Sequence, residues 1–313
     1  MKVTILGAAG FIGTNLALHF LNTNDEITLV DEKDEYFFNM PLMENAKRIS
    51  VEFDAANVDF DEIVRDQDFV YHLISTNNPT TSNKNIGRDL TDNIMITIKL
   101  LEACVKNHVK RVIFISSGGT VYGPDANCPI KEDDETNPIN TYGIQKLTIE
   151  KLFYLYEYMH GLDYRVVRLS NPYGPYQRPN GKLGVITTFI YRALNDQTIS
   201  VYGDGSVIRD YIYIEDAING IIMIAACETE QKIYNLGSGV GTSVNDVIEI
   251  IKKITGRKLD VKYIEKRSVD VPVNILDVSK FRAIGGDKIV NVSLEDGIKK
   301  TIQFFENNMQ LYT

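Results

Sequence analysis

An apolar segment followed by three evenly spaced glycines opens the chain and constrains its fold more than any other feature. Residues 2–6 form a β-branched run, Gly7, Gly10 and Gly13 follow, and residues 14–20 have a helical pattern. Glycines let the backbone approach a pyrophosphate, and a helix start offers unpaired N–H groups and a positive dipole end. The segment therefore predicts a dinucleotide-binding turn, although a tight turn without a ligand is the alternative. The candidate contacts are Gly7, Gly10, Phe11, Ile12 and Gly13.

A second apolar run, residues 27–30, ends in an acidic residue. Asp31 follows the glycines at about the 20-residue distance typical of dinucleotide-binding units. An acid at this strand end can accept hydrogen bonds from the adenosine ribose and would repel a 2′-phosphate, which favours NAD over NADP. Because Lys33 lies nearby, NADP remains an alternative cofactor. The alternative role for Asp31 is that of a loop residue that binds no ligand.

Apolar strands then alternate with helical patterns, which predicts a Rossmann-type, doubly wound parallel sheet of the α/β class. The expected elements are strands at 49–53, 69–74 and 111–116 and helices at 93–107 and around Tyr142. Asp54 and the turn 74–76 fall at strand ends, the edge where such sheets bind ligands.

A stretch rich in glycine and proline, residues 171–181, looks like a crossing into a second, smaller lobe. We expect a first domain at residues 1–171, to which about 207–238 return, and a lobe at 172–313. The helices expected beyond the crossing are 185–195, 215–227, 244–255 and 294–307.

Composition excludes several classes of function. A net charge of −9 and a pI near 5.1 argue against a nucleic-acid surface, and no apolar run reaches transmembrane length. Scattered cysteines and histidines argue against a metal site, and the cysteines are expected to be reduced thiols of a cytoplasmic protein. The cysteines are Cys104, Cys128 and Cys227.

Tyr142 is the only one of the 17 tyrosines with a lysine four residues later, Lys146. On a helix these side chains share one face, so the ammonium can favour the ionised phenol. Lowering a phenol pKa from about 10 to about 7 takes roughly 4 kcal/mol, of which one lysine supplies a part. A cationic nicotinamide would add more, so the pair makes most sense beside a dinucleotide site.

Five motifs in order along the chain carry a family resemblance. They are Gly7-x-x-Gly10-x-x-Gly13, Ser116 to Gly123, Tyr142-x-x-x-Lys146, Arg168-x-x-Asn171-x-Tyr173-Gly174-Pro175 and Arg209-Asp210-Tyr211-Ile212. Together they resemble the extended short-chain dehydrogenase/reductases, most closely the UDP-glucose 4-epimerase-like NAD-dependent sugar-nucleotide epimerases, over essentially the whole chain. The resemblance implies a Rossmann domain, a C-terminal sugar-nucleotide lobe and a homodimer packed through two helices per subunit.

The resemblance also implies a role for each matching residue. Tyr142 would be the catalytic base, and Lys146 would lower its pKa and bind the nicotinamide ribose. Asp54 would contact adenine, and Asn171 would lie near the substrate diphosphate. The remaining matches are Arg209 and Arg267 as a diphosphate clamp, Asp270 on the nucleotide and Tyr202 at the nucleobase. A surface ion pair is the alternative for either arginine.

One position departs from the family pattern. Gly118 stands where an active-site Ser or Thr is usual, so the helping hydroxyl would come from Ser117 or Thr120. Neither Gly119 nor Thr120 is the acid that sugar-nucleotide dehydratases place there, which disfavours loss of water. The implied reaction is a redox-neutral 4-epimerisation through a 4-keto sugar.

Substrate identity depends on Asn274, because a bulky aromatic at the matching family position excludes N-acetyl groups. The smaller side chain favours a UDP-N-acetylhexosamine, or both acetylated and plain hexoses, and a UDP-uronic acid stays open. The alternatives to an epimerase are a nucleotide-sugar dehydratase, decarboxylase or reductase, and a non-catalytic NAD-binding regulator.

Overall fold

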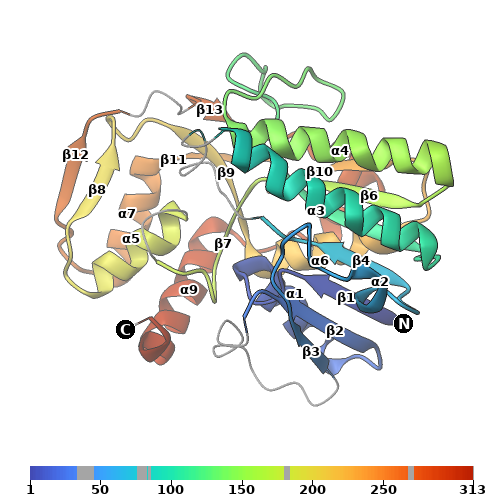
Figure 1. Ribbon diagram of the computed structural model, residues 1–313. Coiled ribbons are helices and arrows are strands. Elements are labelled where there is room, and N and C mark those ends of the chain that lie inside the picture. The colour runs from blue at the N-terminus through green and yellow to red at the C-terminus, as the bar shows by residue number, and fades with distance from the viewer. Residues whose placement is uncertain (34–45, 76–82, 84–85, 180–183, 267–270, 313) are drawn as a thin grey trace. The chain divides into compact units, whose positions relative to one another are not determined.

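The computed structural model of the chain (Figure 1) describes residues 1–33, 46–75, 83, 86–179, 184–266 and 271–312. The chain divides into two compact units. The first unit comprises Met1–Val121, Pro138–Arg168 and Ile222–Tyr234, and the second comprises Tyr122–Asn137, Leu169–Ile221 and Asn235–Thr313.

A seven-stranded parallel sheet forms the centre of the first unit, with strand order β10-β6-β5-β4-β1-β2-β3. This confirms the predicted fold class. The strands are β1 (Lys2–Leu6), β2 (Glu26–Asp31), β3 (Ala46–Ser50), β4 (Phe69–His72), β5 (Arg111–Ser117), β6 (Tyr164–Leu169) and β10 (Ile233–Leu236). Its helices are α1 (Phe11–His19), α2 (Phe60–Ile63), α3 (Ile86–Lys106) and α4 (Thr141–His160), with a 3₁₀ turn at Phe20–Asn22.

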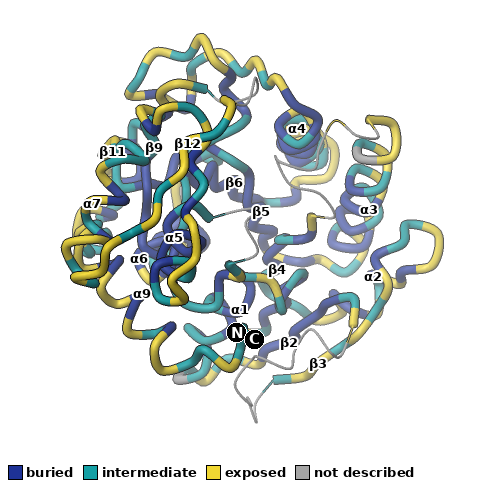
Figure 2. Tube along the Cα trace, turned by 90° about the vertical axis from the view of Figure 1, so that its left-hand side faces the viewer, coloured by how far each residue is buried: buried dark blue, intermediate teal, exposed yellow. Residues whose placement is uncertain are grey.

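Helices α3 and α4 lie side by side against one face of this sheet, and α1 lies on the other (Figures 1 and 2). The apolar faces of α3 and α4 bury a core in which Phe114 stacks on Phe153 at 5.5 Å between ring centroids. Helix α4 begins where the Asn140 side chain accepts a hydrogen bond from Gly143 N (2.8 Å), and it ends at Gly161 in the left-handed conformation.

Two predicted elements differ from the observed ones. The third strand is β3, residues 46–50, and not 49–53, because Phe53 turns into the core while the strand itself stays mostly exposed. Helix α3 begins at Ile86, seven residues before the predicted start at 93, because its first turns are polar and carry no apolar periodicity.

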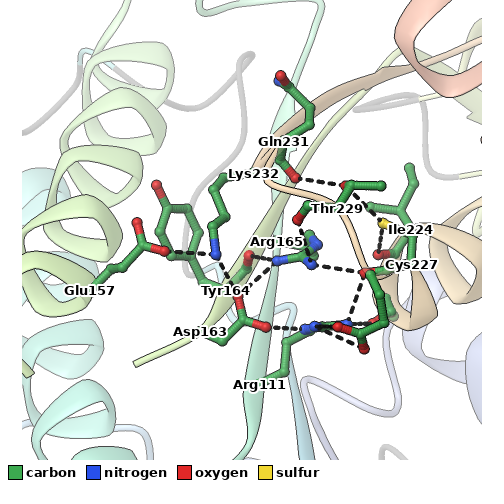
Figure 3. Close-up of polar contacts among 12 residues, drawn as sticks. Arg111, Glu157, Asp163, Tyr164, Arg165, Ile224, Cys227, Thr229, Gln231 and Lys232 are labelled. Carbon is green, nitrogen blue, oxygen red and sulfur yellow. Dashed lines mark hydrogen bonds and ion pairs between the residues drawn. The ribbon is translucent and has the colours of Figure 1, made fainter. Parts of the chain in front are cut away.

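A polar network ties residues 225–232 to the amino ends of β5 and β6 (Figure 3). Arg111 donates to Asp163 (2.6 Å) and to the carbonyl of Ala225 (2.7 Å). Lys232 and Arg165 also pair with Asp163, at 2.7 and 2.8 Å. We call Arg111, Asp163, Arg165 and Lys232 the amino-end network. It holds the carbonyl end of α6 (Ile214–Ala226), where cations are favourable.

The second unit is built on a small mixed sheet in which β9 pairs with β7, β11 and β13. The strands of this sheet are β7 (Asn171–Tyr173), β9 (Ile208–Tyr213), β11 (Gly241–Ser243) and β13 (Val273–Asn274). The unit also contains a separate parallel pair, β8 (Ile199–Tyr202) and β12 (Val261–Ile264). Its helices are α5 (Val185–Leu194), α7 (Val244–Thr255), α8 (Ser279–Ala283) and α9 (Leu294–Asn308), with 3₁₀ turns at Gly286–Lys288 and Met309–Leu311.

Residues 122–137 cluster with the second unit, although the sequence alone placed them in the first domain. Ile130 bridges to Leu276, and its carbonyl accepts from Asn235 Nδ2 at 2.8 Å. These partners are more than a hundred residues away in sequence, so no local signal marks them.

Among the described helices, none combines the length and apolar character that a membrane crossing requires.

Candidate active site

The glycine turn between β1 and α1 has the geometry that the spacing predicts. Gly7 has φ +82° and its N–H donates to Val30 O at 2.9 Å. A Cβ on Gly13 would lie 2.2 Å from Gly7 O, so only glycine lets α1 come this close to the turn. Gly10 caps α1 without a side-chain hydrogen bond, and Phe11 and Ile12 form its first turn. The first N–H groups of a helix lack intrahelical partners, which suits a diphosphate.

Asp31 ends β2 beside this turn and is 8% exposed. Its carboxylate accepts hydrogen bonds from Ala9 N and Glu32 N, both at 2.8 Å. The acid therefore helps to shape the glycine turn. This position at the carboxyl edge of the sheet suits contact with a ribose, so a cofactor with this chemistry fits the residues present.

Asp54 lies in a turn four residues beyond the end of β3. Its carboxylate accepts from Ala56 N (3.0 Å) and Asn57 Nδ2 (2.5 Å) and so stabilises the turn itself. Contact between Asp54 and adenine stays a prediction.

Tyr142 and Lys146 lie one turn apart near the start of α4, as predicted. Lys146 Nζ is 5.5 Å from the centroid of the Tyr142 ring and donates to Ile115 O at 2.9 Å. Burial raises the pKa of Tyr142 to about 12 and lowers the pKa of Lys146 to about 8. Burial thus opposes both charged forms, so lysine proximity alone does not ionise the phenol.

A buried ion pair under Lys146 was missed by sequence reasoning. Glu150 accepts from Arg168 Nη2 at 2.7 Å and from Ser116 Oγ at 2.5 Å. The side chains of Arg168 and Glu150 are 4% and 2% exposed. We call Ser116, Glu150 and Arg168 the carboxyl-end network. The sequence contains a signal for this pair. Glu150 follows Lys146 at the same four-residue spacing that separates Tyr142 from Lys146, and it lies on a helix face that is otherwise buried.

The segment with the unusual glycine lies against the start of α4. A Cβ on Gly143 would lie 2.6 Å from Thr120 O. Glycine at this position therefore lets the backbone at Thr120 pack directly against the first turn of α4. Thr120 Oγ1 is buried and has no hydrogen-bond partner among the described residues. Ser117 ends β5 and is partly exposed, and Gly118 is buried between them.

In the second unit, three predicted substrate residues stand on adjacent strands. Arg209 pairs with Asn274 across β9 and β13, while Asn171 of β7 pairs with Tyr211 two residues along β9. Arg209 Nη1 donates to the carbonyls of Ile208 (2.9 Å) and Val271 (2.6 Å). Asn171 Nδ2 donates to a β9 carbonyl at 2.9 Å, and Asn274 is 2% exposed.

Tyr202 ends β8 with 44% of its surface exposed. Arg267 and Asp270 lie outside the described residues. The roles of Tyr202, Arg267 and Asp270 stay predictions.

Parallel sheets with a glycine turn after β1 and a tyrosine and lysine on a helix over the same sheet define the short-chain dehydrogenase/reductase class. The model of the NAD dependent epimerase/dehydratase family matches residues 3–237, so the chain belongs to this family. This confirms the predicted resemblance.

Relatives that the chain resembles include several enzymes of nucleotide sugars. A solved UDP-glucose 4-epimerase from Thermotoga maritima, with UDP-glucose, is 31% identical with a TM-score of 0.91, covering 99% of this chain and 100% of that one. A UDP-N-acetylglucosamine 4-epimerase from Methanobrevibacter ruminantium is 31% identical with a TM-score of 0.88, covering 98% and 99%. A dTDP-4-dehydro-6-deoxyglucose reductase of Escherichia coli is 32% identical over 315 residues, 96% of each chain.

Proposed function

We propose that this protein is an NAD-dependent 4-epimerase of a UDP-hexose or a UDP-N-acetylhexosamine. The observation that carries the proposal is the pair Tyr142 and Lys146 on α4, with Gly119 and Thr120 in place of an acid. A general base is required for any C4 oxidation, and no second acid is available at that position for loss of water. The similar solved 4-epimerases support this choice within the family.

Tyr142 removes the proton of the sugar 4-hydroxyl as the C4 hydride leaves, which gives a 4-keto sugar. NAD⁺, when bound, would supply the hydride acceptor and a positive charge. Because burial raises the pKa of Tyr142, this charge and the Lys146 ammonium together must favour the phenolate. After the keto sugar turns over, Tyr142 returns the proton to the oxygen and the hydride returns to the opposite face of C4.

Thr120 is the better candidate for the hydroxyl that usually stands at Gly118. Its Oγ1 is buried without a partner among the described residues, and a buried hydroxyl without a partner costs free energy. A substrate oxygen would satisfy it. Ser117, at the end of β5, is the second candidate.

Substrate recognition is assigned to the second unit. Arg209 and Arg267 would clamp the diphosphate beside Asn171, because guanidinium groups pair well with phosphate oxygens. Asp270 would bind the nucleotide and Tyr202 the base. Asn274, the strand neighbour of Arg209, is short enough to leave room for an N-acetyl group.

A nucleotide-sugar reductase is the second candidate, favoured by the similar Escherichia coli reductase. A reductase consumes reduced cofactor in proportion to product, whereas an epimerase regenerates it in each cycle.

We also propose a homodimer packed through α3 and α4. Exposed apolar side chains gather on these two helices, and Tyr158 is 81% exposed. Patches of this kind mark protein interfaces. The exposed residues are Ile86, Met95, Ile144, Tyr154, Leu155, Tyr158 and Met159. A dimer that persists in sedimentation with Tyr158→Glu would contradict this interface.

A cytoplasmic location is proposed because Cys104, Cys128 and Cys227 are free thiols.

The function is tested by incubating purified protein with single UDP-sugars and no added cofactor. We expect interconversion of C4 epimers without net change of reduced cofactor, and NAD in the supernatant after denaturation. Asn274→Tyr should retain turnover of UDP-glucose and lose turnover of the acetylated sugar. Turnover by the parent confined to the plain pair would contradict the assignment of Asn274, and stoichiometric consumption of NADH would favour the reductase.

A further inference from the structure

Tyr142, Lys146 and Glu150 stand at successive four-residue steps on α4. The third member is held from two strands of the sheet. Arg168 near the end of β6 donates to both of its oxygens, through Nε at 3.1 and 3.2 Å and through Nη2 at 2.7 Å. Ser116 near the end of β5 donates at 2.5 Å. Glu150 is therefore fixed in position one helical turn below Lys146.

Among the residues that the structure describes, few charged or titratable groups surround Lys146. Tyr142 and Glu150 face it from α4, His72 from β4, and Arg168 of β6 lies behind Glu150. Burial and the Lys146 charge lower the pKa of His72 to about 3, so this ring is neutral. From α3, Thr97 contacts His72, whose Nε2 bonds Thr97 Oγ1 at 2.9 Å.

Burial is the main cause that lowers the pKa of Lys146 to about 8, and Glu150 is the anion that opposes it. Phe114, with its ring centroid 4.7 Å from Nζ, closes the same space against water. A lysine here would lose much of its charge near neutral pH if the anion were absent, because desolvation favours the neutral amine.

We propose that Glu150, fixed by Arg168 and Ser116, is a positioning residue that keeps Lys146 in its ammonium form over the pH range in which Tyr142 works. The proposal rests on the proposed function for its catalytic meaning. The effect on Lys146 itself does not depend on any substrate.

The direct test is the titration of Lys146 in NAD-saturated protein that carries carbon-13 at lysine Cε, followed by NMR. Lys146→Arg assigns the signal. We expect the midpoint to fall by about one pH unit in Glu150→Gln relative to the parent. Glu157→Gln is the matched control, because Glu157 also lies on α4 but pairs with Lys232 at 2.7 Å. It should leave the midpoint unchanged.

A second variant is needed in case Glu150→Gln does not fold. Glu150→Leu combined with Arg168→Met replaces the buried pair by apolar groups, a change that proteins often tolerate. It should also lower the Lys146 midpoint. An unchanged midpoint in the folded variants would overturn the proposal.

Activity gives a second readout. If the protein epimerises a UDP-sugar, the descending limb of the kcat–pH profile should move to lower pH in Glu150→Gln with KM little changed. A uniform loss of kcat at every pH would show a purely structural role and contradict the proposal. If no UDP-sugar is turned over by the parent, the proposed function fails, while the lysine titration still decides the role of Glu150.

Discussion

The first unit contains two arginine–carboxylate networks at opposite ends of the same sheet. The carboxyl-end network is almost fully buried, whereas Asp163 in the amino-end network is 28% exposed and has three cationic partners. The first lies under Lys146, and the second holds the carbonyl end of α6. Similar chemistry thus serves two purposes, because ligands bind parallel sheets at their carboxyl edge and the opposite edge is free to serve stability.

A change in the carboxyl-end network should therefore affect chemistry, whereas a change in the amino-end network should affect only stability. Removal of one member of a buried ion pair leaves the charge of the other uncompensated, so the loss of stability is severe. A network with several cations around one carboxylate can lose a member and stay neutralised.

Tyr142→Phe should lower kcat by about 10³-fold, since the general base is removed. The fold should not change, because only a hydroxyl is lost. Tyr156→Phe, farther along α4, is the control and should retain the parent rate. Epimer formation from a UDP-sugar, followed by chromatography, gives the measurement. A variant that keeps the parent rate would require a different base.

Arg168→Met should destabilise the protein by about 3–5 kcal/mol, because it leaves Glu150 buried without its cation. Arg111→Met, in the amino-end network, should cost only about 1–2 kcal/mol, since Asp163 keeps Lys232. Denaturant unfolding monitored by circular dichroism compares the two. Equal losses would remove the distinction between the networks.

Gly13→Ala should destabilise the protein by about 3 kcal/mol and weaken NAD binding, because the new Cβ would meet Gly7 O at 2.2 Å. Gly161→Ala, at the amino-end side of the sheet, should cost about 1 kcal/mol. Its φ is +70°, but nothing lies within 4 Å of the added Cβ. Unfolding free energies and NAD titration calorimetry measure both effects, and unaltered NAD affinity in Gly13→Ala would argue against the turn as cofactor site.

Asp163 should make the protein sensitive to acid. Burial opposes its ionisation, but hydrogen bonds from Lys232 and Arg111 and the charge of Arg165 outweigh this and lower its pKa to about 2. Because the folded value lies below the ordinary value of 3.8, the contribution to stability is complete above pH 4 and is lost as the pH falls through 2. It amounts to about 2 kcal/mol.

Asp163→Asn should remove this dependence. The difference in unfolding free energy between parent and variant should shrink as the pH falls from 5 toward 2. A constant difference would place the acid sensitivity in other groups.

Much of the fold followed from local patterns. The strand, glycine turn and helix at the N-terminus, and most later helices, were predicted within a few residues, and the fold class and family are confirmed. The edge strand β3 was misplaced because an exposed edge strand has little apolar signal. The site residues Arg267 and Asp270 lie outside the described part, and the site roles stay predictions.

The glycine turn, the tyrosine–lysine spacing and the family could be inferred from the sequence, because each motif that carries them lies within a short stretch of the chain. The surroundings of these motifs follow from tertiary packing alone. Asp31 binds the Ala9 amide, and Arg168 reaches Glu150, through contacts across 22 and 18 residues. Burial then fixes how readily Tyr142 and Lys146 hold charge, and burial is a property of the packed core that no local pattern contains.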